Sequence, residues 1–188
     1  YGIRIMEMDM DKEVQAIALL YDVYWKEKSF LSFEDFFERY TKERRKALEA
    51  FRKKTTLCRD CFYRGLKARI YRTWAGLITQ IQGGYVAESV FGEGTVAMSE
   101  ELDHKGADIR VTYKDRVLNY QVKKTSFSGV KSARHLPRRK AEGESIDIFY
   151  EVPNSGIFVN PKTLNGELRI PYKRFIDDKR TERLGNGF

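Results

Sequence analysis

Residues 106–124 read GADIRVTYKDRVLNYQVKK, and this stretch decides the fold. Apolar residues alternate with polar ones over 107–113 and again over 118–123, which is typical of β-strands with one buried face. The residues between them, 114–116, predict a short turn, so the two strands are expected to form a hairpin.

The hairpin places its polar residues on one face, because successive side chains of a strand point to opposite sides. Asp108 and Arg110 share the polar face of the first strand, and Gln121 and Lys123 share the corresponding face of the second. If the chain turns at 114–116, Asp108 lies within a few residues of being opposite Gln121 and Lys123. We therefore expect a carboxylate and an amine on the same side of the sheet.

The part of the chain before the hairpin has helical periodicity. Apolar residues recur at helical spacing over 11–25, and Ser32 followed by Asp35 is typical of a helix start. Residues 42–54 are strongly charged and predict an exposed helix. Residues 71–91 predict a long, mostly buried helix with Glu88 on its last turn.

The part after the hairpin returns to strand patterns. Residues 125–145 predict a loop or short helix, 146–152 and 157–159 predict apolar strands, and 168–171 predict an edge strand. A helical first half followed by a sheet-rich second half is typical of an α+β fold. We expect one domain over 1–188.

Composition excludes several classes of protein. With 188 residues, 41% of them hydrophobic and 33% charged, the chain is too apolar for a disordered protein and too charged for a membrane protein. No stretch approaches the ~20 apolar residues of a membrane-spanning helix, so no membrane partner is expected. Two cysteines argue against a disulfide scaffold and fit a cytoplasmic location.

The net charge of +8 is unevenly distributed. Residues 43–72 carry 11 basic and 3 acidic groups, and residues 116–141 carry 8 basic and no acidic groups. The segment between them, 73–115, carries 3 basic and 7 acidic groups. Basic segments can hold a phosphate backbone while carboxylates hold a cation against it. For 43–72, an exposed helical face without a ligand is an equally good interpretation.

Carboxylates beside a lysine have the chemistry that phosphodiester cleavage requires. Mg²⁺ prefers hard oxygen ligands, commonly one or two carboxylates together with water and substrate oxygens. A lysine beside the ion can orient or deprotonate the attacking water or stabilise the transition state. Asp108 and Lys123 fit these roles, with Asp103 and Glu88 as further acidic residues.

Two sequence features resemble the PD-(D/E)xK nuclease superfamily, namely 106–111 (GADIRV) and the triplet Gln121-Val122-Lys123. The triplet departs from the superfamily's Asp/Glu-x-Lys because Gln121 is neutral, which leaves the metal ligands and their number open. The resemblance implies a restriction-endonuclease-like core, a mixed central sheet flanked by helices. Here that core has a helical N-terminal half, with 1–70 as a helical subregion and 71–188 as the catalytic core.

A longer run is similar to TaqI-type restriction endonucleases. It comprises 68–80 (ARIYRTWAGLITQ), 84–88 (GYVAE), two aspartates five residues apart, Asp103 and Asp108, and the pair Lys123-Lys124. This similarity implies Mg²⁺-dependent cleavage of double-stranded DNA by a homodimer. It also implies a short palindromic site, for which TCGA is a candidate.

The expected site follows from these residues. Its catalytic group comprises Asp103, Asp108, Gln121, Lys123 and Lys124, and the metal ligands are expected among Asp108, Asp103 and Glu88. Strand alternation favours Lys123 over Lys124, and a β-bulge would reverse that choice.

A basic segment that follows the lysine pair is the candidate for DNA contact, because Gly and Ser allow close approach to phosphates and Arg reads guanine. Its candidate residues are Ser126, Ser128, Lys131, Arg134, Arg138, Arg139 and Lys140.

Three other interpretations remain open. A catalytically inactive DNA-binding protein on the same scaffold would explain the neutral Gln121. A structural basic protein would explain the positive charge, but not the acidic segment 73–115. Surface charges on an ordinary hairpin would explain Asp108 and Lys123 without any active site.

Overall fold

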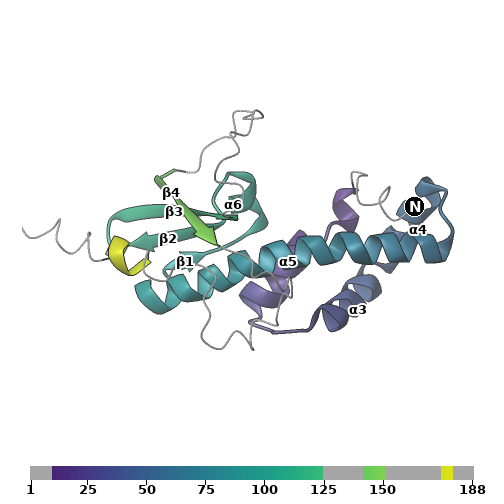
Figure 1. Cartoon of the computed structure of the whole chain (residues 1–188), viewed down its shortest axis with the longest axis horizontal. Coiled ribbons are helices and arrows are strands. Elements are labelled where there is room, and N and C mark those ends of the chain that lie inside the picture. Colours follow the sequence, from purple (N-terminus) through teal and green to yellow (C-terminus); the bar gives the residue numbers. More distant parts are fainter. Residues whose placement is uncertain (1–9, 125–141, 151–174, 180–188) are drawn as a thin grey trace, which may run out of the picture. The chain divides into compact units, whose positions relative to one another are not determined.

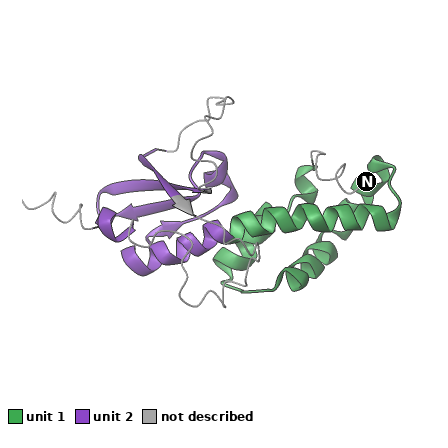
Figure 2. Cartoon of the chain, viewed as in Figure 1, with its two compact units in different colours: residues 1–78 green, residues 79–188 purple. Residues whose placement is uncertain are grey.

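The computed structural model describes residues 10–124, 142–150 and 175–179. The strands expected at 157–159 and 168–171 lie outside these ranges, as does the basic segment that begins at residue 125. The chain divides into two compact units, residues 1–78 and residues 79–188 (Figure 2).

The first unit is helical. Where the sequence predicts helix over 11–25, the structure has a 3₁₀ turn, η1 (Lys12–Val14), then α2 (Ile17–Leu20) and the π-helical η2 (Tyr21–Lys26). The prediction of one regular helix is therefore only partly correct, because Gln15 adopts an extended conformation between η1 and α2.

Two further helices match their predictions closely. In α3 (Phe33–Glu43), the Ser32 side chain accepts a hydrogen bond from the Asp35 amide at 3.1 Å, which caps the helix as predicted. Helix α4 (Arg45–Thr55) is largely exposed but buries Leu48 and Phe51.

A buried aromatic cluster holds the first unit together. Tyr24 is fully buried; its hydroxyl donates to the Leu31 carbonyl at 2.9 Å and accepts from the Trp74 indole at 2.8 Å. Phe33 packs edge-on against Tyr71, with ring centroids 4.9 Å apart. Aromatic rings in such arrangements contribute large buried areas with defined geometry.

The long helix α5 (Arg59–Phe91) begins twelve residues before the predicted position (Figure 1). Its start is fixed at Cys58, whose carbonyl accepts from the Phe62 amide at 2.9 Å and whose sulfur accepts from the Cys61 amide at 3.2 Å. The helix continues through Gly83-Gly84 and ends before Gly92, which has a positive φ of 111°.

The second unit contains a four-stranded mixed sheet in the order β1-β2-β3-β4 (Figure 1). Its strands are β1 (Val96–Ala97), β2 (Ile109–Tyr113), β3 (Arg116–Lys124) and β4 (Glu144–Tyr150). The first three pair antiparallel, and β4 pairs parallel to β3. The predicted hairpin is thus confirmed as β2 and β3.

One face of this sheet is apolar and buried. It presents Ile109, Val111, Leu118, Tyr120, Ile146 and Ile148. Phe175, from a short helix at residues 175–179, packs on Tyr120 with centroids 4.9 Å apart, and Phe91 at the end of α5 contacts Phe175 and Tyr113. The fold is α+β, and the opposite face of the sheet carries its polar residues.

Candidate active site

Three polar residues of the candidate site lie on or beside β3. Asp108 lies directly before β2 and contacts β3, because its amide donates to the Tyr120 carbonyl at 3.0 Å. On the other side of β3, Gln121 pairs with Asp147 of β4. Because neighbouring strands are about 4.8 Å apart, Gln121 and Asp147 occupy adjacent positions on one face of the sheet.

Asp108 is half-buried and oriented by the backbone of β3. Its Oδ2 atom accepts a hydrogen bond from the Val122 amide at 2.7 Å. A carboxylate that accepts from a backbone amide makes a strong, charge-assisted hydrogen bond. Asp108, the main acidic residue of the predicted site, is therefore oriented by the protein backbone before any ligand binds.

Gln121 fixes the chain that leads into β2. Its Nε2 atom donates to the Gly106 carbonyl. Gly106 has a φ of +83°, and a Cβ atom added there would lie 3.3 Å from Gln121 Nε2. Gly106 therefore combines a backbone conformation that favours glycine with close approach of the Gln121 side chain.

Lys123 lies two residues beyond Gln121 on the same strand, and therefore on the same face. Its Nζ atom donates to Asp147 Oδ2 at 2.6 Å, with 43% and 41% of the two side chains exposed. Asp147 was missed by the sequence reasoning. Its alternation with Ile146 and Ile148 was visible, but its parallel pairing with β3 was not.

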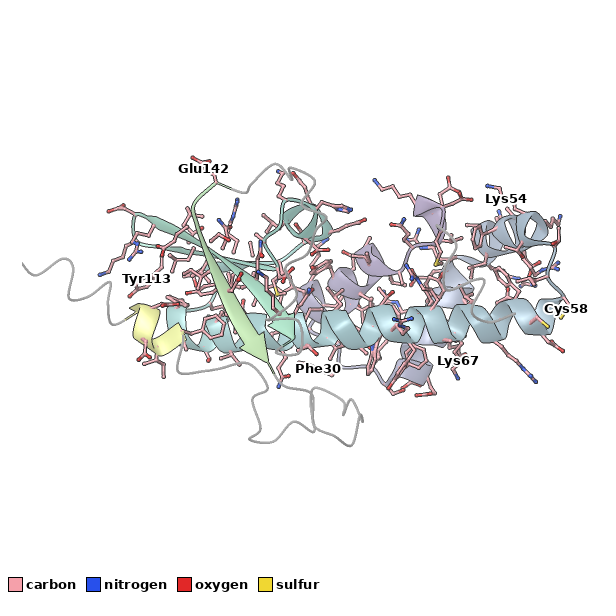
Figure 3. The ribbon with its side chains drawn as sticks, turned by 45° about the horizontal axis from the view of Figure 1, so that its top comes forward. Phe30, Lys54, Cys58, Lys67, Tyr113 and Glu142 are labelled. Atoms are coloured by element: carbon pink, nitrogen blue, oxygen red, sulfur yellow. The ribbon has the colours of Figure 1, made fainter. Side chains whose placement is uncertain are left out.

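A second group of residues stabilises the sheet next to these. Arg110 Nε donates to Asn119 Oδ1 at 3.0 Å, and Asn119 Nδ2 donates to the Glu142 carbonyl at 2.8 Å. Glu142, labelled in Figure 3, lies just before β4. These bonds connect β2 and β3 to the start of β4 and help to set the position of Asp147 along β3.

The other predicted acidic residues come from separate elements. Asp103 lies in α6 (Glu100–His104), which Ser99 caps by accepting from the Leu102 amide at 3.2 Å. Glu88 is on the last turn of α5, as predicted. Within the described ranges, no three or more His, Cys, Asp or Glu side chains lie close enough to hold a metal ion. Asp103, Asp108 and Glu88 therefore do not form one preassembled cluster there.

The remaining predicted residues are only partly described. Lys124 is the last residue of β3 and pairs with Tyr150. The candidate DNA-contacting residues between Ser126 and Lys140 lie outside the described residues. The structure thus brings Asp108 into contact with β3 between Gln121 and Lys123, and places Asp147 of β4 next to these two residues. In the described part of the chain, no helix is both long and apolar enough to cross a membrane.

Known proteins are similar in sequence to this chain over most of its length. The sequence model of the TaqI restriction endonuclease family matches residues 1–188. A type II restriction enzyme of Thermus thermophilus is 30% identical over 194 residues, which cover 99% of this chain and 73% of that enzyme. The type II restriction enzyme TaqI of Thermus aquaticus is 32% identical over 155 residues, or 79% of this chain and 59% of that enzyme. No solved structure matches significantly.

Proposed function

Because this chain belongs to the TaqI restriction endonuclease family, we propose that it cleaves double-stranded DNA at a short palindromic site by Mg²⁺-dependent phosphodiester hydrolysis. TCGA is the candidate site. The observation that carries the proposal is the contact of the Asp108 carboxylate with the amide of Val122, the residue directly before Lys123 in β3. In this proposal residues 1–188 form a single nuclease domain, with 71–188 as its catalytic core.

The carboxylate oxygens of the proposed ligands suit a hard divalent cation. Asp108 supplies a carboxylate that is already oriented by the Val122 amide, and carboxylate oxygens are the ligands Mg²⁺ prefers. Asp108 would hold the ion, with Asp103 and Glu88 as additional proposed ligands from α6 and α5. A bound Mg²⁺ would supply polarisation of the scissile phosphate and a lower pKa for the attacking water.

Lys123 is the proposed basic residue of the reaction. Lys123 directly follows Val122, which Asp108 contacts, so its ammonium group can orient the attacking water or stabilise negative charge that develops on the phosphate. Gln121 has a supporting role, because its amide holds the Gly106 carbonyl at the entrance to β2. Lys124 remains the alternative if the reaction uses the other lysine of the pair.

A palindromic site requires one catalytic centre for each strand, which a two-fold symmetric homodimer supplies. We propose that DNA contacts come from the basic segment after β3, with Ser126, Ser128, Lys131, Arg134, Arg138, Arg139 and Lys140 as candidates. This segment has no acidic residue, so it favours a polyanionic ligand.

A second candidate is a catalytically inactive, sequence-specific DNA-binding protein. The observation in its favour is Gln121, a neutral side chain whose amide bonds the Gly106 carbonyl. This second function predicts DNA binding that is unaffected by loss of Asp108 and no cleavage by the unmodified chain.

Incubation of the purified chain with unmethylated plasmid DNA separates the two. We expect discrete fragments with Mg²⁺ and intact plasmid with EDTA, and mapping the fragment ends gives the site. A Mg²⁺-dependent smear would reject sequence specificity. Intact plasmid together with a mobility shift on duplex DNA would favour the inactive DNA-binding protein.

A further inference from the structure

We infer that Asp147 is a positioning residue of this site, which holds the Lys123 side chain over the face of the sheet that also carries Gln121. The inference rests on the proposed nuclease function and adds a residue from a third strand to it. It is based on the pairing of β3 with β4 and on the contact between the two side chains.

The pairing of the strands brings Asp147 to this face. Asp147 is the partner of Gln121, and Lys123 lies two residues further along β3. Lys123 is therefore a diagonal neighbour of Asp147 on the adjacent strand, within reach of its long side chain. The side chains do meet, since Lys123 Nζ lies 2.6 Å from Asp147 Oδ2.

The side chains of Asp108 and Gln121 have backbone partners. Asp108 Oδ2 accepts from the Val122 amide, and Gln121 Nε2 donates to the Gly106 carbonyl. The carboxylate of Asp147 forms an ion pair with the Lys123 ammonium group. Gln121 is neutral, so the negative charge next to Gln121 comes from its partner on β4, Asp147.

The ion pair between Lys123 and Asp147 affects the position of the lysine amine more than the free energy of unfolding. Ion pairs between half-exposed side chains contribute little to folding, and these two side chains are 43% and 41% exposed. A lysine amine on a flexible four-carbon stem is otherwise free to sample many rotamers. Asp147 restricts that freedom and keeps the amine over the site, as partners of catalytic side chains commonly do.

The test is a double-mutant cycle measured by single-turnover cleavage of a duplex that contains the mapped site. We expect Asp147→Asn to slow cleavage by about 10- to 100-fold with little change in DNA affinity, and Asp147→Glu to restore most of the rate. In a chain that already carries Lys123→Met, Asp147→Asn should not slow cleavage further, because Asp147 acts only by positioning Lys123.

Additive losses would overturn the inference and indicate that Asp147 acts independently of Lys123, for example as a metal ligand. Parallel losses of DNA affinity and thermal stability would also overturn it, in favour of a structural role. The matched control is Glu144→Gln. Glu144 pairs with Arg116 at 2.7 Å on the same two strands, with comparable exposure, and its loss should leave cleavage unchanged.

A second measurement does not depend on cleavage. We expect Asp147→Asn to make Lys123 react several-fold faster with an amine-acetylating reagent, as quantified by mass spectrometry, while Lys54 and Lys105 keep their rates. An unchanged rate at Lys123 would overturn the inference. If the unmodified chain cleaves no DNA, the proposed function fails, and the acetylation rates still decide whether Asp147 holds Lys123.

Discussion

Asp108 and Gln121 each form a hydrogen bond to a backbone group on the opposite side of the hairpin, just beyond the last paired residues of β2 and β3. The Asp108 carboxylate accepts from the Val122 amide of β3, and the Gln121 amide donates to the Gly106 carbonyl before β2. Each side chain thus satisfies a backbone group beyond the last paired residues, which would otherwise need another partner. The positions of the proposed site residues Asp108 and Gln121 therefore depend on the local fold at this end of the sheet.

Gly106 is the first test of that dependence. Gly106→Ala should lower the free energy of unfolding by about 1–2 kcal/mol, because a φ of +83° is unfavourable for alanine. It should also slow cleavage, since the new Cβ atom would lie 3.3 Å from Gln121 Nε2. Urea unfolding and single-turnover cleavage measure the two effects.

The matched control for Gly106 is Gly76, which lies in α5 with nothing within 4 Å of an added Cβ atom. Gly76→Ala should stabilise the chain by about 0.5–1 kcal/mol, because alanine is the better helix former. Equal effects of the two substitutions would contradict the special role of Gly106.

The choice between the two lysines can be decided directly. Lys123→Met should slow cleavage by about 10²- to 10³-fold, because it removes a positive charge beside the reacting phosphate. Lys124→Met should have a smaller effect on cleavage. Single-turnover rates and DNA affinities of both variants provide the measurement. A larger loss of cleavage for Lys124→Met would assign the role to Lys124.

The DNA-binding segment is tested by salt dependence. Arg138→Ala combined with Arg139→Ala should weaken DNA binding and reduce the slope of log K against log salt by about 0.9 for each phosphate that the variant no longer neutralises. Fluorescence anisotropy at several salt concentrations measures that slope. Lys54→Ala is the control, because Lys54 is already paired with Asp11 at 2.6 Å. An unchanged slope in the arginine variant would contradict the assignment of this segment.

The first unit should lose stability at alkaline pH. Burial raises the pKa of Tyr24 from 10.0 to about 12, and it also raises the pKa of Tyr40. A folded-state pKa above the unfolded value means that full stability is present below pH 10 and is lost as the pH rises towards 12.

Urea unfolding between pH 9 and pH 11.5 measures this dependence. Tyr24→Phe should have a weaker dependence on pH, although it also loses the hydrogen bonds to Leu31 and Trp74. An unfolding free energy that stays constant over this range in the unmodified chain would contradict the predicted role of buried tyrosines.

The parts of the fold that sequence predicted best are governed by local patterns. Alternation over 107–113 and 118–123 predicted the hairpin, because both strands lie within one short stretch. Ser32 was identified as a cap for the same reason, since its hydrogen-bond partner is three residues away.

The parts that sequence did not predict depend on distant contacts. The strand containing Asp147 was expected, but its place beside β3 depends on parallel pairing across the intervening segment. The first twelve residues of α5 are rich in charge, and their buried residues Phe62 and Leu66 pack in the helical unit. Helix α6 was missed even though Ser99 provides a local start signal.

The most direct test of the central claim is single-turnover cleavage by Asp108→Asn, measured together with its DNA affinity. Asparagine can still accept from the Val122 amide through its side-chain oxygen, so the substitution removes the charge while it keeps this hydrogen bond. We expect cleavage to fall below detection in Mg²⁺ while DNA affinity and unfolding temperature are retained. Cleavage at the rate of the unmodified chain would contradict the assignment of Asp108 as the central acidic residue of the site.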